Sequence, residues 1–344
     1  MSKLNPLAVV LSIVDPEYPE DADFEALTQD RKLLAKAIKL AARNGLNYLF
    51  FQRLRELNEE LSLVYAERFE EEEQNLNIFM ETISLLDDVL QSHGIDYIVI
   101  KECSTLPNIP RDVDIFIPQY KKDELIKAFE TKCMKCVHSD DIETTLVGEG
   151  YLSLDVYTRI CYFGVDCIDE AFLLNSCCIN EVCKVKYPGL QGEADLLLTV
   201  VHSLFGHGRM TLLDFLNLKT LKRNVKDPGF CREYAIKHGW GEVFDSVMRQ
   251  VDSLYEKMYQ RREIIRFPYS FGQDFMVRCA YTMAGFKPGR FGKMVLYVSF
   301  AWDSIIIRTQ GSLLYNVLRS IKPVRKIINS LGYLIRYMRG DRYS

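Results

Sequence analysis

The stretch Ile109-Pro-Arg-Asp-Val-Asp-Ile-Phe-Ile117 decides how the rest of the chain is interpreted. Successive side chains of a β-strand point to opposite faces, so Asp112 and Asp114 share one face. The apolar residues that alternate with them take the other face and can be buried. The stretch therefore predicts a strand that holds two carboxylates on rigid backbone at the rim of a sheet.

A third acid falls on a second alternating run, Leu152-Ser-Leu-Asp-Val-Tyr157. Its leucines and valine form an apolar face, which puts Asp155 on the opposite face. Neighbouring carboxylates repel when ionised unless a cation lies between them, and Mg²⁺ is usually held by one or two carboxylates plus substrate phosphates. We therefore predict that Asp112, Asp114 and Asp155 bind Mg²⁺ or Mn²⁺.

These segments resemble the nucleotidyltransferase fold of the DNA polymerase β superfamily, and most of all its poorly characterised bacterial and archaeal branch. That branch has a helical lead, a strand ending in Lys-Gly, an Arg-containing turn into Asp-Ile-Asp, and a later helix with spaced histidines before an Asp. The likeness covers roughly residues 25 to 225. Its segments here are Ile98-Val-Ile-Lys101, Arg111-Asp-Val-Asp114, and Glu193 to His202 running through His207 to Asp214.

The resemblance implies transfer of a nucleoside monophosphate from a nucleoside triphosphate to an acceptor hydroxyl. It makes the three aspartates the catalytic and metal-binding residues of a two-cation displacement. The further residues expected to bind the nucleotide or the acceptor are Lys101, Ser104, Arg111, His202 and Arg209. The chain departs from the superfamily at the Gly-Ser that holds triphosphate oxygens, because Lys101-Glu102-Cys103-Ser104 stands there.

The expected fold class is α+β, with a small mixed sheet flanked by helical regions. Helical spacing predicts two helices between Phe24 and Leu63 and a long helix from about Glu70 to Gln91, before a first strand at Ile95. From Gly192 onward the pattern is helical to the end. The predicted units are an N-terminal helical region 1–92, a catalytic core 93–190, a helical domain 191–262 and a basic helical region 263–344.

Within the core, Lys121 to Cys133 is expected to form a helix, and strands are expected near Cys136, at Glu143 to Val147 and at Leu152 to Tyr157. The turn Gly148-Glu-Gly150 predicts a hairpin between the last two strands. Residues from Ile160 to Pro188 give no clear pattern. Acids at positions 166–170 are expected to serve a helix N-terminus, and Asp214 to open a later helix.

The charge of the chain is uneven. Between Lys287 and Arg342 there are eleven Lys or Arg and two acids, a net charge of +9, which leaves −13 for residues 1–286. With interleaved tyrosines, this basic stretch predicts an RNA acceptor, such as a tRNA 3′ end. A membrane surface is the competing interpretation, although the apolar run Met294 to Ile307 is shorter than the roughly 20 residues of a spanning helix. A solvated basic face is the third.

Composition and cysteines suggest a globular cytoplasmic protein without a transmembrane segment. The chain has 344 residues, 48% hydrophobic and 26% charged, in the range of globular proteins. The apolar run Leu7 to Val14 lacks a basic flank and a cleavage site, so it is interpreted as part of the fold. With nothing directing secretion, the ten cysteines are expected to be reduced.

Three function classes remain open from the sequence. The first is metal-dependent nucleotidyl transfer to RNA, to a small molecule or to a protein side chain. The second is a catalytically inactive nucleic-acid-binding relative, which the missing Gly-Ser favours. The third is a peripheral membrane or scaffold protein.

Overall fold

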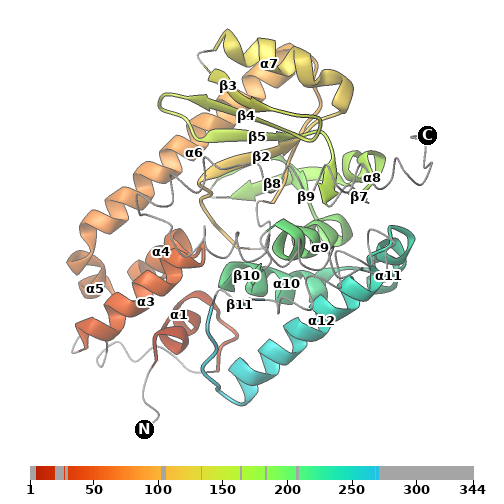
Figure 1. Ribbon diagram of the computed structural model, residues 1–344. Helices are drawn as coiled ribbons and strands as arrows, with labels where there is room; N and C mark the ends of the chain where they lie inside the picture. Colours follow the sequence, from red (N-terminus) through yellow and green to blue (C-terminus); the bar gives the residue numbers. More distant parts are fainter. Residues whose placement is uncertain are drawn as a thin grey trace, which may run out of the picture.

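The structure is a computed structural model, and it describes residues 5–19, 27, 30–101, 106–132, 134–162, 165–182, 184–206, 209–267 and 269–270. It has the expected α+β class, with one small mixed sheet and many helices (Figure 1). Ser104, His207 and the basic C-terminal region lie outside the described residues. The expectations for them stay predictions.

The N-terminal region is helical, as expected. Its first helix is capped by the Asn5 side chain, which accepts hydrogen bonds from the backbone N–H groups of Leu7 and Ala8, at 3.0 Å each. Two helices were expected between Phe24 and Leu63, and the described residues 30–64 form three. The extra break arises because Asn58 ends one helix and its side chain accepts a hydrogen bond from the backbone N–H of Leu61 in the next. The helices are α1 (Pro6–Val14), α3 (Arg31–Arg43), α4 (Asn47–Leu57), α5 (Glu59–Val64) and α6 (Ala66–Ser92).

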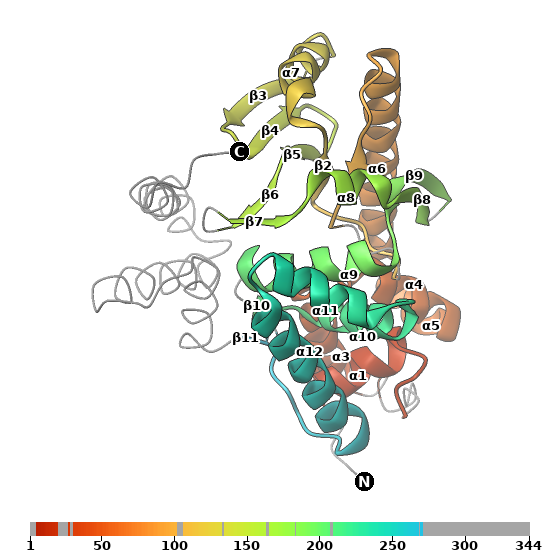
Figure 2. The same cartoon turned by 90° about the vertical axis from the view of Figure 1, so that its right-hand side faces the viewer.

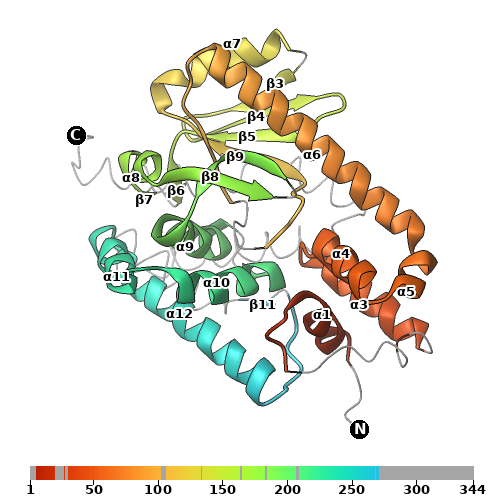
Figure 3. The ribbon, with the colours of Figure 1, turned by 180° about the vertical axis from the view of Figure 1, so that it is seen from behind.

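Helix α6 is the long helix expected from the sequence and has 27 residues. Its C-terminal half buries Phe79, Ile83, Leu86 and Leu90 against the sheet, while its N-terminal half runs down beside α4 and α5 (Figure 3). The hydroxyl of the buried Thr82 also accepts a hydrogen bond from the backbone N–H of Leu152, at 3.0 Å. One continuous helix therefore joins the sheet to the N-terminal helices.

The central sheet has the strand order β1-β2-β5-β4-β3, in which β2 and β5 are parallel and the other pairs are antiparallel. The predicted hairpin between β4 and β5 is confirmed, with Gly150 at φ +81° in the turn. The first strand is shorter than expected and begins at Ile98. The strands are β1 (Ile98–Val99), β2 (Asp112–Phe116), β3 (Met134–Ser139), β4 (Glu143–Gly148) and β5 (Ser153–Tyr157).

Helices α6 and α7 (Lys122–Glu130) cover one face of this sheet. Leu125 and Phe129 of α7 and the α6 stripe pack onto apolar side chains of β2, β4 and β5. At the β1–β2 edge, Ile100 and Phe116 of the other face pack into the core shared with α9 (Gly192–Val201), which lies below the sheet in Figure 2. The aspartate face of β2 is this second face.

Two hairpins and a short helix occupy the segment that the sequence left unassigned. Asp166 does not serve the helix, because both of its carboxylate oxygens accept hydrogen bonds from Arg159, and Asp169 makes no side-chain capping bond; only Glu170 lies in the first turn. The expectation for these acids was therefore wrong for Asp166. The elements are β6 (Ile160–Tyr162), β7 (Val165–Ile168), α8 (Glu170–Asn175), β8 (Cys177–Val182) and β9 (Val185–Leu190).

The region after Gly192 is mostly helical. Asp214 opens a helix as expected, since its carboxylate and the Thr211 hydroxyl form a reciprocal capping box. Two short strands, β10 (Arg209–Met210) and β11 (Tyr269–Ser270), pair where only helix was expected. The other elements are the π-helix η2 (His202–Gly206), α10 (Leu212–Asn224), α11 (Pro228–Lys237), α12 (Gly241–Tyr255) and the π-helix η3 (Glu256–Gln260).

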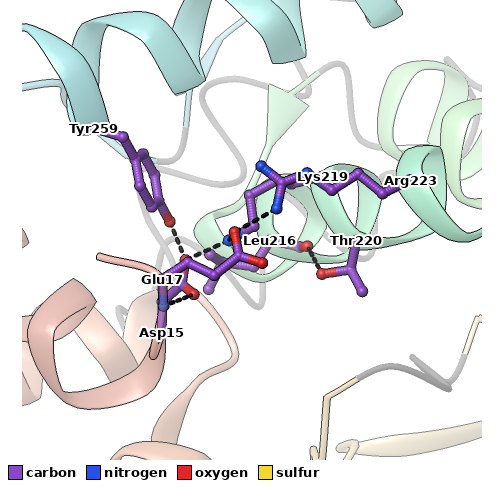
Figure 4. Close-up of polar contacts among 7 residues, drawn as sticks. All are labelled: Asp15, Glu17, Leu216, Lys219, Thr220, Arg223 and Tyr259. Atoms are coloured by element: carbon purple, nitrogen blue, oxygen red, sulfur yellow. Dashed lines mark hydrogen bonds and ion pairs between the residues drawn. The ribbon is translucent and has the colours of Figure 1, made fainter. Parts of the chain in front are cut away.

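A buried ion pair fastens the end of α1 to this helical half. Lys219 of α10 lies 2.6 Å from Asp15, and each of these side chains is 6% exposed. The Tyr259 hydroxyl also donates to Asp15, while Glu17 joins the network through Lys219 and Arg223 (Figure 4). Two parts of the chain that are distant in sequence thus share one polar contact inside the core.

Within the part of the chain described here, no helix has the combined length and apolar character needed to cross a membrane.

Candidate active site

Three aspartates meet on one face of two neighbouring strands. The parallel register places Asp114 directly opposite Asp155, and Asp112 lies two residues earlier on the same face of β2. On the other face the apolar partners Val113 and Ile115 are completely buried. The strand assignments and the buried face predicted from the alternation are therefore confirmed.

Lys101 is brought to the same face by the antiparallel strand β1. The backbone N–H of Ile100 donates to the carbonyl of Asp114 at 2.8 Å, which fixes the next residue beside β2. The Lys101 Nζ then lies 2.6 Å from Asp114 Oδ1 and 3.8 Å from the centre of the Tyr157 ring. The two charged side chains are only 9% and 13% exposed, so this is a largely buried ion pair.

The site carries more negative than positive charge, and the pKa values of its groups reflect this. Burial raises the pKa of Asp114 from its ordinary 3.8 to about 6. The Lys101 ammonium opposes this rise, and the smaller repulsion from Asp112 and Asp155 adds to it. Burial and the nearby Asp155 also raise the pKa of Asp112. Burial alone would lower the pKa of Lys101, but the Asp114 carboxylate, together with Tyr157 and Tyr162, outweighs it and raises that pKa well above its usual value.

Asp155 gives the clearest sign of an unmet electrostatic need. Its Oδ1 is buried and finds no hydrogen-bond partner among the described residues. A buried carboxylate oxygen without a donor is costly, and a cation is one way to satisfy it. The donor set of three carboxylates on one face suits a hard divalent cation such as Mg²⁺.

The side chains are not arranged as a finished metal site. Across the described ranges, no group of three His, Cys, Asp or Glu side chains is placed to hold a metal ion. At Asp114 the ammonium of Lys101 takes the position of a counter-charge. Binding of a cation by all three carboxylates would therefore require side-chain rearrangement.

Of the other expected site residues, Arg111 lies near the carboxylates, whereas His202 and Arg209 lie on elements of the helical half. Arg111 is exposed just before β2, and its charge lowers the pKa of Asp112, so it lies near the carboxylates. His202 begins the π-helix η2 in the helical half, and Phe205 of that helix packs on Tyr162 of β6 with ring centres 6.0 Å apart. Arg209 begins β10, opposite Ser270.

Two residues of the carboxylate face were not predicted from the sequence to belong to the site. Tyr157 lies under the Lys101 ammonium, and Glu143 lies opposite it on β4, in register. Both alternate in phase with Asp155 and its neighbour Thr145, which was the available signal. Glu143 adds a further acid to the same face of the sheet.

The solved structures that resemble this chain include an antibiotic adenylyltransferase and an antibiotic-resistance factor. The chain is similar to the lincosamide antibiotic adenylyltransferase LnuA in its lincomycin-bound crystal structure, with 19% identity and a TM-score of 0.31 over 41% of this chain and 95% of that chain. It is also similar to the antibiotic-resistance factor ANT(2'')-Ia, with 12% identity and a TM-score of 0.28 over 53% of this chain and 96% of that chain.

No family model matches the sequence, and no curated protein matches it. With TM-scores this low, neither structural likeness carries the chemistry of the site. That chemistry rests on the residues described above.

Proposed function

We propose that the protein is a nucleotidyltransferase, which moves a nucleoside monophosphate from a nucleoside triphosphate to an acceptor hydroxyl with the help of divalent cations. The observation that carries the proposal is the register of β2 and β5, which sets Asp114 opposite Asp155 with Asp112 on the same face. The unpartnered Asp155 Oδ1 supports it, as an acceptor that a cation would satisfy.

Each aspartate has a role in this proposal. Asp112 and Asp114 would hold the cation that carries the triphosphate, and Asp155 would share a second cation near the acceptor hydroxyl. When bound, such cations supply charge stabilisation to the attacking and leaving oxygens of an in-line displacement. The strand backbone contributes rigidity, because carboxylates fixed on β2 and β5 need little reorganisation to keep their spacing.

Basic residues near the carboxylates would bind the phosphates. The positive charges of Lys101 and Arg111 both act on Asp112, because each lowers the pKa of that carboxyl. Arg can bind two phosphate oxygens at once, whereas Lys acts as a point charge. Together they would replace part of what the Gly-Ser of the superfamily provides, with Ser104 as a further candidate.

Three classes of acceptor are tested. RNA is favoured by the +9 charge between residues 287 and 342, which lies outside the described residues. A small hydroxyl compound and the hydroxyl of a protein side chain are the alternative acceptors, and neither requires a contribution from that basic stretch. All three fit transfer to a hydroxyl at the same carboxylate face.

The proposal is tested by label transfer. The full chain would be incubated with each of the four α-³²P-labelled nucleoside triphosphates and Mg²⁺ or Mn²⁺, with total RNA, a protein extract or a small-metabolite extract as acceptor. We expect label in one acceptor fraction with wild type, and none with Asp112→Asn, which keeps the shape but removes a ligand charge.

The matched control is Asp88→Asn, which makes the same chemical change at an exposed position on α6. This variant should transfer label like wild type. Equal transfer by Asp112→Asn and Asp88→Asn would refute the role of the carboxylate face. Label in RNA or in a small compound would identify the acceptor class directly.

A further inference from the structure

The ammonium of Lys101 forms an ion pair with Asp114, a carboxylate that the proposed divalent cation would need as a ligand. Resting on the nucleotidyltransferase function proposed above, we propose that Lys101 is the internal counter-ion of the metal-free site and leaves Asp114 when a divalent cation binds there. Lys101 would then be a positioning residue with two resting places, the carboxylate in the free protein and the substrate phosphates in the loaded one.

The contact geometry favours exchange over shared occupancy. The Lys101 Nζ lies 2.6 Å from Asp114 Oδ1, and both side chains are nearly buried, so solvent has little access to this ion pair. A second cation on the same carboxylate would stand within a few ångströms of Nζ, where like charges repel strongly in a low-dielectric site. As they stand, the described acids form no three-ligand group. The arrangement around Lys101 is that of a site balanced by its own lysine.

The backbone at Lys101 is also unusual. Its φ is +64°, a conformation that residues other than glycine rarely adopt. Such strain persists when the surroundings hold it in place, and here the ion pair with Asp114 and the Tyr157 ring are two of the contacts that hold the side chain. Release from Asp114 would remove one of these restraints, which makes exchange for a divalent cation easier.

A different role for Lys101 predicts the opposite result. If the lysine stayed on Asp114 and oriented that carboxylate toward the metal, it would strengthen metal binding, as outer-shell partners commonly do. Removing the ammonium would then weaken the metal complex. The sign of the change in metal affinity therefore decides between a displaced counter-ion and a fixed orienting group.

The experiment measures Mn²⁺ binding directly, by electron paramagnetic resonance of the free ion and by calorimetry, without nucleotide and at neutral pH. The variant is Lys101→Met in the full chain, which keeps the length of the side chain and removes its charge. The matched control is Lys127→Met, which makes the same change at an exposed position of α7, on the opposite side of the sheet.

We expect Lys101→Met to bind Mn²⁺ about tenfold more tightly than wild type, which equals about 1.4 kcal/mol, and Lys127→Met to match wild type. Unchanged or weaker binding by Lys101→Met would overturn the counter-ion role while leaving the metal site intact. Absence of binding in all three proteins would overturn the metal site itself, and with it the proposed function.

A measurement on wild type covers the case in which Lys101→Met does not fold. In ¹⁵N-lysine-labelled protein, the buried ammonium of Lys101 should give its own resonance, assigned by its absence in Lys101→Arg. Mg²⁺ should shift this resonance and speed its exchange with water as the ion pair opens. A resonance that stays unchanged while Mn²⁺ binding is measured in the same protein would overturn the proposal.

Discussion

Replacing Lys219 with methionine should destabilise the protein far more than the same change at a neighbouring lysine. Lys219 and Asp15 are each 6% exposed and 2.6 Å apart, so Lys219→Met leaves the Asp15 carboxylate buried with the Tyr259 hydroxyl as its nearest donor. Removing one partner of such a pair typically costs about 3–5 kcal/mol. Lys222, three residues further along α10, pairs with Asp252, and their side chains are 35% and 64% exposed. Lys222→Met should therefore cost only about 0–1 kcal/mol, as is usual for the loss of an exposed ion pair.

The assay is urea unfolding followed by tryptophan fluorescence, with Trp240 as a fully buried reporter. The double variant Asp15→Asn/Lys219→Met should recover much of the stability lost in Lys219→Met, because it leaves no unpaired charge in the core. Equal free energies of unfolding for Lys219→Met and Lys222→Met would refute the reasoning. The reasoning would also be refuted if the double variant lost as much free energy of unfolding as Asp15→Asn and Lys219→Met lose separately, added together.

The pKa of Asp114 lies at about 6 in the folded protein, above its ordinary value of 3.8. The stability contributed by this group is therefore complete below about pH 4 and is lost as pH rises through 6. In metal-free protein, Asp114→Asn should remove this group's contribution to the pH dependence of the free energy of unfolding, measured in urea between pH 4 and 7. Lys101→Ala should raise the KM for the nucleotide more than it lowers kcat if the ammonium reaches the phosphates, and an unchanged KM in steady-state assays would limit Lys101 to its contact with Asp114. Neutralising Lys322, Arg325 and Lys326 together should flatten the log–log salt dependence of RNA affinity by roughly two units, at about 0.7 per phosphate contact. Binding to anionic vesicles in place of RNA, across the same salt series, would identify a membrane surface as the partner.

The carboxylate strand was predictable because its signal is local. Alternation of acids with valine and isoleucine identifies both faces of β2 within a few residues, and the same holds for β5. The direct pairing of β2 with β5, which brings Asp114 opposite Asp155, is not visible in either stretch. It depends on a chain path that places β3 and β4 beyond β5, and the sequence supplied that path only through the family resemblance.

The partner of Lys101 was not predictable in the same way. From the sequence, its position at a strand end favoured contact with phosphate, because nothing local records that β1 runs antiparallel beside β2. The excess of negative charge that draws the ammonium to Asp114 appears only when three aspartates meet on one face. The strands β6, β7, β10 and β11 were missed for another reason, since two to four residues give too little periodicity to recognise. Strands β8 and β9 have six residues each but lack the strict alternation of polar and apolar residues that identifies β2.

Helix α6 has a consequence for dissecting the protein into fragments. Its last four turns supply part of the core under the central sheet, including Ile83, Leu86 and Leu90, while its first turns belong with the N-terminal helices. A fragment that starts at residue 93 would expose that side of the sheet to water and lose the Thr82 hydrogen bond to Leu152. Expression of the sheet as a separate unit therefore needs the chain to begin upstream of α6, at the turn around Tyr65.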